Sequence, residues 1–164
     1  MLCDNTVRTG TERDQRGYFV SDGPIVAVNH IGYVVSDLDL AGRFFEDVLG
    51  FERVVERTGK LGDGESGLMT RRFGVNPRAT GEFIFFRLNG FAVELLAWES
   101  PDRDQTSPKN SDAGGRHLAL SVTDMDAATQ RIAAFGGTEI REPNDAGYIY
   151  VKTPFGLEIQ LIPV

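Results

Sequence analysis

The sequence predicts an α+β domain made of two βαβββ modules. The main observation behind this prediction is a twelve-residue sequence pattern, here called the repeated phrase, that occurs twice. It reads HIGYVVSDLDLA at residues 30–41 and HLALSVTDMDAA at residues 117–128. The two copies lie 87 residues apart, and the two histidines of the chain occupy the same position in each. In both halves, strand pairs follow the phrase. Self-similarity at a fixed offset indicates duplicated structural units, so the halves are expected to fold alike.

Each phrase contains a strand pattern and then the start of a helix. Asp37 and Asp124 are expected to be N-caps, because a carboxylate at that position accepts a hydrogen bond from a free backbone N–H. Apolar residues then recur at helical spacing, at Leu40, Phe44, Phe45 and Val48 in the first half and at Ala128, Ile132 and Phe135 in the second. Gly50 and the pair Gly136-Gly137 are the expected helix ends.

Two hairpins are expected after the helices. The first is FIFFRLNGFAVELLAW, in which Asn89-Gly90 separates two apolar runs and is a strong signal for a tight hairpin turn. The second is GYIYVKTPFGLEIQLIPV, where Pro154 and Gly156 suit a turn. Shorter strands are expected over 51–57 and 138–141. The first half is longer, and its surplus falls at 57–80, a glycine-rich charged stretch that we expect to be a long loop.

The predicted organisation is one folded domain that follows a short N-terminal extension. Residues 1–23 are polar and without periodicity, and they are expected to form a mobile N-terminal extension. The folded part is expected to span 24–164, with one module at 24–100 and the other at 113–164.

Composition excludes several classes of partner. The net charge of −7 and a pI near 4.8 argue against nucleic acid and against membranes, since both favour a basic protein surface. We find no apolar run long enough for a membrane helix and no secretion signal. Cys3 is the single cysteine, so an internal disulfide is excluded. A cytoplasmic protein with a small-molecule partner is the expectation.

Strand alternation indicates which side chains share a face. With period two, His30, Glu94, His117 and Gln160 are placed mid-strand on the face away from the helices, together with Glu158. An unpaired polar group buried there would cost about 1–3 kcal/mol, and a shared divalent metal would satisfy all of them. The alternative is that each histidine is structural, with its own hydrogen bond in the core. The matched positions of the two histidines favour the metal.

The quoted phrases, together with FAVELLAW and YVKTPFGLEIQLI, resemble the vicinal oxygen chelate superfamily, which includes glyoxalases, bleomycin-resistance proteins and extradiol dioxygenases. This resemblance spans most of 26–163. It implies a cup-shaped mixed sheet with helices on its outer face and a divalent metal (Zn, Ni, Co, Mn or Fe) inside. The metal ligands implied are His30, Glu94, His117 and Gln160. Gln160 stands where the family usually has glutamate, and an amide cannot accept a proton near neutral pH.

The resemblance implies a metal-dependent lyase or isomerase, similar to glyoxalase I or methylmalonyl-CoA epimerase, that acts as a homodimer. The metal would chelate neighbouring oxygens of a small substrate and stabilise an enolate, while Glu94 or Glu158 would move the proton. Arg71, Arg72 and Trp98 are candidate substrate-binding residues. Two alternatives stay open. One is a non-haem iron dioxygenase of the extradiol type, and the other is a non-catalytic resistance protein that binds a small molecule.

Overall fold

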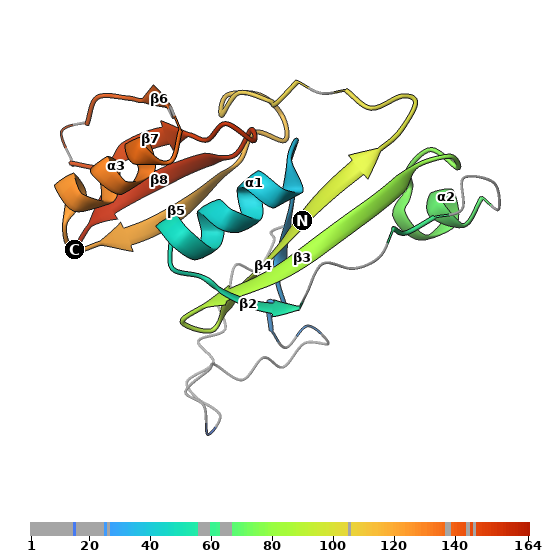
Figure 1. Ribbon diagram of the computed structural model, residues 1–164, viewed down its shortest axis with the longest axis horizontal. Helices are drawn as coiled ribbons and strands as arrows, with labels where there is room; N and C mark the ends of the chain where they lie inside the picture. Colours follow the sequence, from blue (N-terminus) through green and yellow to red (C-terminus); the bar gives the residue numbers. More distant parts are fainter. Residues whose placement is uncertain are drawn as a thin grey trace, which may run out of the picture.

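The computed structural model describes residues 15, 25, 27–55, 60–62, 67–104, 106–136, 139–143, 145 and 147–164. The expected extension at 1–23, apart from residue 15, lies outside these described residues, as does the expected start of the domain at residue 24. The described chain forms two mixed, four-stranded sheets with few helices (Figure 1). The predicted α+β class and the βαβββ order of the two halves are confirmed.

The first module has the strand order β1-β4-β3-β2. Strand β1 runs parallel to β4, and the other two pairs are antiparallel. The bounds are β1 (Ile31–Val34), β2 (Glu52–Val55), β3 (Thr80–Leu88) and β4 (Phe91–Glu99). Asn89 and Gly90 join β3 to β4 with φ of 49° and 84°. A two-residue turn of type I′ requires positive φ at both positions, so the predicted hairpin is confirmed.

The second module repeats this arrangement in the order β5-β8-β7-β6. Strand β5 is parallel to β8, and the β7–β8 and β6–β7 pairs are antiparallel. Its strands are β5 (His117–Val122), β6 (Glu139–Ile140), β7 (Ile149–Lys152) and β8 (Glu158–Pro163). In the turn before β8, Thr153 Oγ1 donates to the carbonyl of Leu157 at 2.8 Å. Among the described residues no strand pair joins β1 to β5, so the expected single cup is divided into two sheets.

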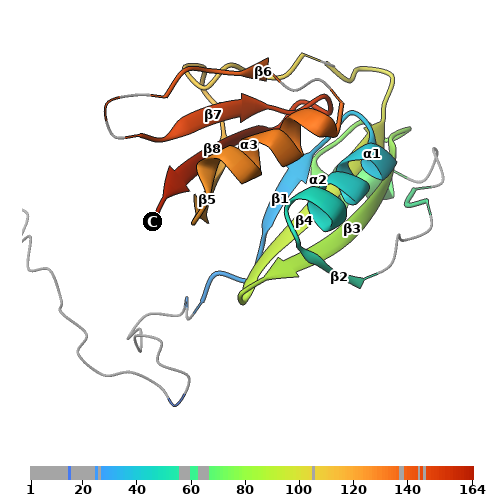
Figure 2. The ribbon, with the colours of Figure 1, turned by 60° about the vertical axis from the view of Figure 1, so that its left-hand side comes forward.

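The helices begin where the sequence predicts. In α1 (Leu38–Arg43), Asp37 Oδ1 accepts from the N–H of Leu40 at 2.9 Å, and in α3 (Met125–Ala134), Asp124 Oδ1 accepts from Ala127 at 2.9 Å. Both helices lie on the same side of the two sheets (Figure 2). No helix among the described residues is long and apolar enough to cross a bilayer.

The first helix changes its winding at two phenylalanines. It passes from α1 directly into a π-helical turn, η1 (Phe44–Val48). Phe44 and Phe45 are adjacent in sequence, yet both are 0 % exposed. The wider π turn rotates less per residue than an α-helix, which brings these neighbours onto the same buried face. The sequence pattern predicts a helix here but not this change of winding.

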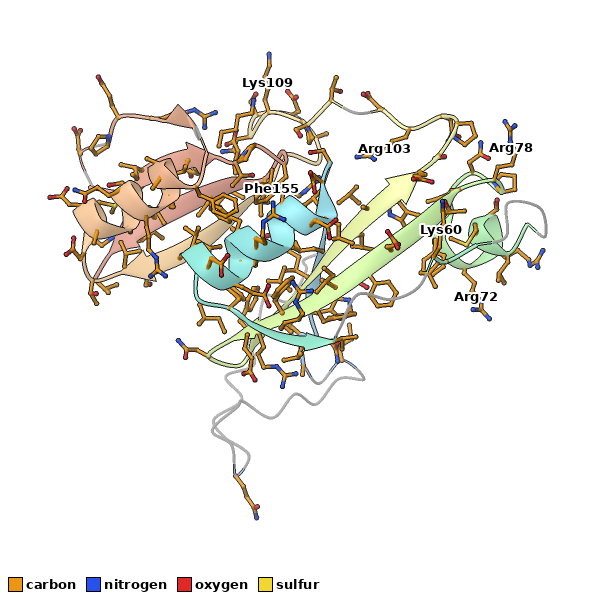
Figure 3. All side chains as sticks on the ribbon, in the orientation of Figure 1. Lys60, Arg72, Arg78, Arg103, Lys109 and Phe155 are labelled. Atoms are coloured by element: carbon orange, nitrogen blue, oxygen red, sulfur yellow. The ribbon has the colours of Figure 1, made fainter. Side chains whose placement is uncertain are left out.

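Aromatic packing joins the two modules. The ring of Phe44 meets Phe135 at 5.2 Å and Phe155 at 5.3 Å between centroids, both edge to face. Figure 3 labels Phe155 beside α1. Edge-to-face pairs at these distances are favourable beyond the area they bury. One apolar core therefore extends through both modules.

The expected long loop at 57–80 is partly wrong, because it contains a helix. Within its described residues, α2 (Leu68–Phe73) lies between Gly67 and Gly74, whose φ values are 64° and 68°. These left-handed glycines end the helix on both sides, and Met69, 1 % exposed, anchors it to the core. Six residues are too few for a visible hydrophobic period. Of the expected short strands at 51–57 and 138–141, the described residues form β2 and β6, and residues 56, 57 and 138 lie outside the described part.

Candidate active site

The candidate residues occupy the side of the sheets away from the helices, here called the open face. In the parallel pair β1–β4, Gly32 lies opposite Glu94, and in β5–β8, Ala119 lies opposite Gln160. Gly32 and Ala119 are 87 residues apart, the same offset as the two histidines. Gln160 is therefore the structural counterpart of Glu94. The expected mid-strand placement is wrong for three residues: His117 and Glu158 begin their strands, and His30 precedes β1.

His30 and Glu94 are brought together in the first module. His30 Nε2 lies 3.5 Å from Glu94 Oε2. The other ring nitrogen, Nδ1, is 2.7 Å from Asn29 Oδ1, a contact that requires a proton on Nδ1. With the proton on Nδ1, the Nε2 lone pair of a neutral imidazole would be available to a metal ion. Two electron-pair donors at this separation suit a cation between them, so this pair fits half of a divalent-metal site.

Burial makes Glu94 a weaker acid than a carboxyl group in water. Its side chain is 17 % exposed, and burial raises the pKa of the carboxyl group above its ordinary value, with His30 partly opposing that shift. An added side chain at Gly32 would come within 3.3 Å of Glu94 Oε2. The ring of Phe85 meets the His30 ring edge to face at 5.0 Å. Glu94 therefore lies in a partly buried position beside the His30 ring.

The second module repeats the aromatic contact. His117 meets Tyr150 edge to face at 5.2 Å, as His30 meets Phe85. Each of these two aromatic rings also has an edge-to-face partner two residues earlier in the chain: the centroids are 5.6 Å apart for Phe83–Phe85 and 5.9 Å apart for Tyr148–Tyr150. These aromatic residues were not predicted as part of the site. Their signal is the alternation in FIFF and YIY at corresponding points of the two halves.

Glu158 has a different environment from Glu94. Arg141 donates two hydrogen bonds to it, from Nη1 to Oε2 at 3.1 Å and from Nη2 to Oε1 at 3.0 Å. The Glu158 side chain is 10 % exposed, and this bidentate pair lowers the pKa of its carboxyl group despite the opposing effect of burial. Glu158 is therefore held as an anion with both oxygens engaged. Arg141 was not predicted from the sequence, because its pairing with Glu158 depends on how β6, β7 and β8 pack.

The structure leaves the expected ligands in two groups. His30 and Glu94 form one, while His117 and Gln160 lie on the other sheet. Among the described residues, no three histidine, cysteine, aspartate or glutamate side chains are close enough to hold a metal ion. The donor chemistry of His30 and Glu94 fits a divalent metal, and completing the site requires the two groups to meet.

The three expected substrate-binding residues lie on α2 and on β4 of the first module. Arg71 and Arg72 are exposed on α2, and Figure 3 shows Arg72 at the end of the molecule that carries this helix. Trp98 shares the open face with Glu94, because both are on β4 and four positions apart. Its ring packs on Phe73 of α2 at 5.5 Å. Trp98 therefore fixes α2 against the open face.

The chain belongs to the Glyoxalase/Bleomycin resistance protein/Dioxygenase superfamily, whose sequence profile matches residues 27–161. Among curated proteins it is similar to a 2-epi-5-epi-valiolone epimerase from an Actinomyces species, with 36% identity over 147 residues, 84% of this chain and 79% of the relative. It is also similar to the uncharacterised protein YwkD of Bacillus subtilis, with 29% identity over 107 residues, 65% of this chain and 69% of that protein. The epimerase supports enzyme activity of the isomerase type.

Solved structures support the same fold. A glyoxalase family protein from Bacillus cereus superposes with a TM-score of 0.69 at 20% identity, covering 88% of this chain and 97% of that one. The fosfomycin resistance protein FosX from Listeria monocytogenes, in a complex with Mn(II) and 1S,2S-dihydroxypropylphosphonic acid, superposes with a TM-score of 0.55 at 18% identity. That match covers 84% of this chain and 90% of FosX.

Proposed function

We propose that this protein is a metal-dependent epimerase or related isomerase that moves a proton at a carbon next to a carbonyl group of a small substrate. The observation that carries the proposal is the pair His30–Glu94, 3.5 Å apart on the open face. The 36% identity to an epimerase of the same superfamily supports the reaction type.

The contrast between the two carboxylates supports Glu94 as the group that accepts the proton. A general base works best when its pKa lies near the working pH, and burial raises the pKa of Glu94 towards that range. Arg141 holds Glu158 in its charged form and lowers its pKa. Proton transfer is therefore assigned to Glu94, and Glu158 is assigned the role of orienting Arg141.

His30, Glu94, His117 and Gln160 are the residues proposed to hold a divalent metal. A metal bound there would supply Lewis acidity at two neighbouring substrate oxygens. Asn29 accepts from His30 Nδ1 and so keeps Nε2 available as a ligand. Glu94 would take the proton from the carbon, and the ring of Phe85, opposite Glu94 in the β3–β4 pair and packed on His30, lies beside it.

The test follows exchange of the substrate proton. Purified protein is incubated in D₂O with 2-epi-5-epi-valiolone, the substrate in the relative's name, and deuterium incorporation is followed by NMR. We expect exchange with metal-loaded protein, loss of at least about 100-fold in Glu94→Gln, and near-normal rates in Glu158→Gln. Equal losses in both variants would contradict the assignment of the base.

A further inference from the structure

A second polar site lies in the second module, at the end of the open face where β5 and β8 begin. It is a cavity of about 330 Å³ lined by the loop 107–111, by Arg116 just before β5 and Arg141 just after β6, and by β7, β8 and the turn between them at Gly156. Five ionisable side chains line it: Lys109, Arg116, Arg141, Lys152 and Glu158. Figure 3 shows Lys109 on the loop that borders it.

The charge of this cavity is opposite to that of the whole chain. The protein has a net charge of −7, yet the cavity holds four cationic side chains and one carboxylate, a surplus of three positive charges. Glu158 is already paired in a bidentate manner with Arg141. The side chains of Lys109 and Lys152 form no hydrogen bond or salt bridge with another described residue. Two ammonium groups are thus available to a ligand.

The loop 107–111 packs tightly against the other segments that line the cavity. An added side chain at Gly115 would collide with the backbone carbonyl of Lys109, and one at Gly156 would collide with Ser107 Oγ. The loop 107–111 therefore lies directly on the start of β5 and on the β7–β8 turn. Arg116 is held at 3.3 Å from the carbonyl of Val34 by its Nη2, which ties this wall to β1.

The cavity adjoins the candidate active site. Glu158 lies opposite His117 in the β5–β8 pair and opposite Lys152 in the β7–β8 pair. A molecule that reaches His117 along the open face therefore has the cationic cavity at one end.

In the first module the residues that correspond to Lys152 and Glu158 have a different chemistry, although the fold repeats. By register, Arg87 corresponds to Lys152, and Ala92 corresponds to Glu158. Alanine offers no carboxylate to orient a second guanidinium as Glu158 orients Arg141. The Arg87–Ala92 pair of the first module therefore does not reproduce the charged Lys152–Glu158 pair.

We propose that this cavity binds a small ligand through an anionic oxygen group, a phosphate or a carboxylate. Lys109 and Lys152 supply ammonium groups, Arg116 supplies directed N–H donors, Arg141 adds positive charge beside Glu158, and Ser107 and Ser111 supply hydroxyl groups. Anion binding by the cavity does not rest on the proposed function.

The test measures binding of inorganic phosphate and of acetate to the full-length protein by calorimetry at low ionic strength. We expect saturable binding of at least one of them, and the tighter anion identifies the group as phosphate or carboxylate. Lys152→Gln should weaken that binding about tenfold, since a hydrogen bond to a charged group is lost, and Lys109→Gln should weaken it in the same direction. Both lysines are exposed, so neither change should impair folding.

The matched control is Arg87→Gln, which removes the same charge at the corresponding position of the first module and should leave anion affinity within about twofold. Absence of saturable binding of both anions would overturn the proposal, and so would equal weakening by Arg87→Gln and Lys152→Gln. Metal binding separates this proposal from the proposed function. Lys152→Gln should keep its metal, and His30→Ala should keep its anion affinity.

Discussion

Glu94 and Gln160 occupy the same position in the two copies of one strand pair. Each faces a small residue on the neighbouring parallel strand, Gly32 or Ala119, and those two residues are 87 positions apart. The duplication therefore provides equivalent positions for two of the proposed ligands, but only Glu94 is ionisable. The site is asymmetric in its chemistry while its backbone is symmetric.

This asymmetry predicts that Gln160→Glu strengthens metal binding. A charged carboxylate oxygen attracts a divalent cation more strongly than an amide oxygen, and we expect affinity to rise roughly tenfold. Competition with a chromogenic chelator measures the change. Gln130→Glu, on the exposed surface of α3, introduces the same charge away from the site and should have little effect. Equal gains in both variants would show a general charge effect, contrary to the assigned role of Gln160.

Asn29 is predicted to position His30. Its Oδ1 lies 2.7 Å from His30 Nδ1, and loss of such an outer contact typically weakens metal binding about 10–100-fold. We expect a loss of that size in Asn29→Ala when metal affinity is measured with the same chelator. Asn29→Asp keeps an acceptor oxygen and should retain most of the affinity. A normal metal affinity in Asn29→Ala would show that Asn29 does not position His30.

The two ligand groups are predicted to meet across a homodimer. Within the described part of one chain no three ligand-type side chains are close enough for a metal, so we expect each site to combine residues of two chains. His30→Ala and His117→Ala should each lose metal binding alone. After the two variants are mixed and exchange subunits, metal analysis should show partial recovery. A mixture as metal-free as its components would place all ligands within one chain.

Local signals account for the parts of the fold that the sequence predicts. The turn at Asn89-Gly90 and the caps at Asp37 and Asp124 depend on neighbouring residues, and all are confirmed. The duplicated phrase then relates the two halves without any knowledge of their contacts. The shared open face follows from strand alternation alone.

The features of the fold and the site that the sequence does not predict depend on contacts between residues far apart in the chain. Arg141 and Glu158 pair across three strands, and no local pattern indicates that this carboxylate is engaged. The six-residue helix α2 is held by the burial of Met69 and by the contact of Phe73 with Trp98. Whether His30 and His117 approach each other depends on module pairing, which strand periodicity does not encode.

The two N-caps are predicted to contribute equally to stability. Asp37 and Asp124 each accept a backbone hydrogen bond at 2.9 Å at the same position of a duplicated helix. Replacement by alanine should lower the free energy of unfolding by about 1 kcal/mol at either position. Urea denaturation followed by circular dichroism measures the loss. Replacement by serine restores an acceptor and should recover most of it, whereas equal losses with serine and alanine would argue against capping.

Gly81 is predicted to be required for the position of Trp98. A Cβ atom at residue 81 would lie 2.5 Å from Trp98 Cε3, so the indole ring must move in Gly81→Ala. Overpacking of this kind costs about 1–3 kcal/mol. Trp98 is the single tryptophan of the chain, so its emission spectrum reports the displacement directly. The matched control is the same change in a Trp98→Ala background, where the clash is absent and the added methyl group should cost little stability. If Gly81→Ala leaves both emission and stability unchanged, the ring does not hold α2 against the open face in the way described.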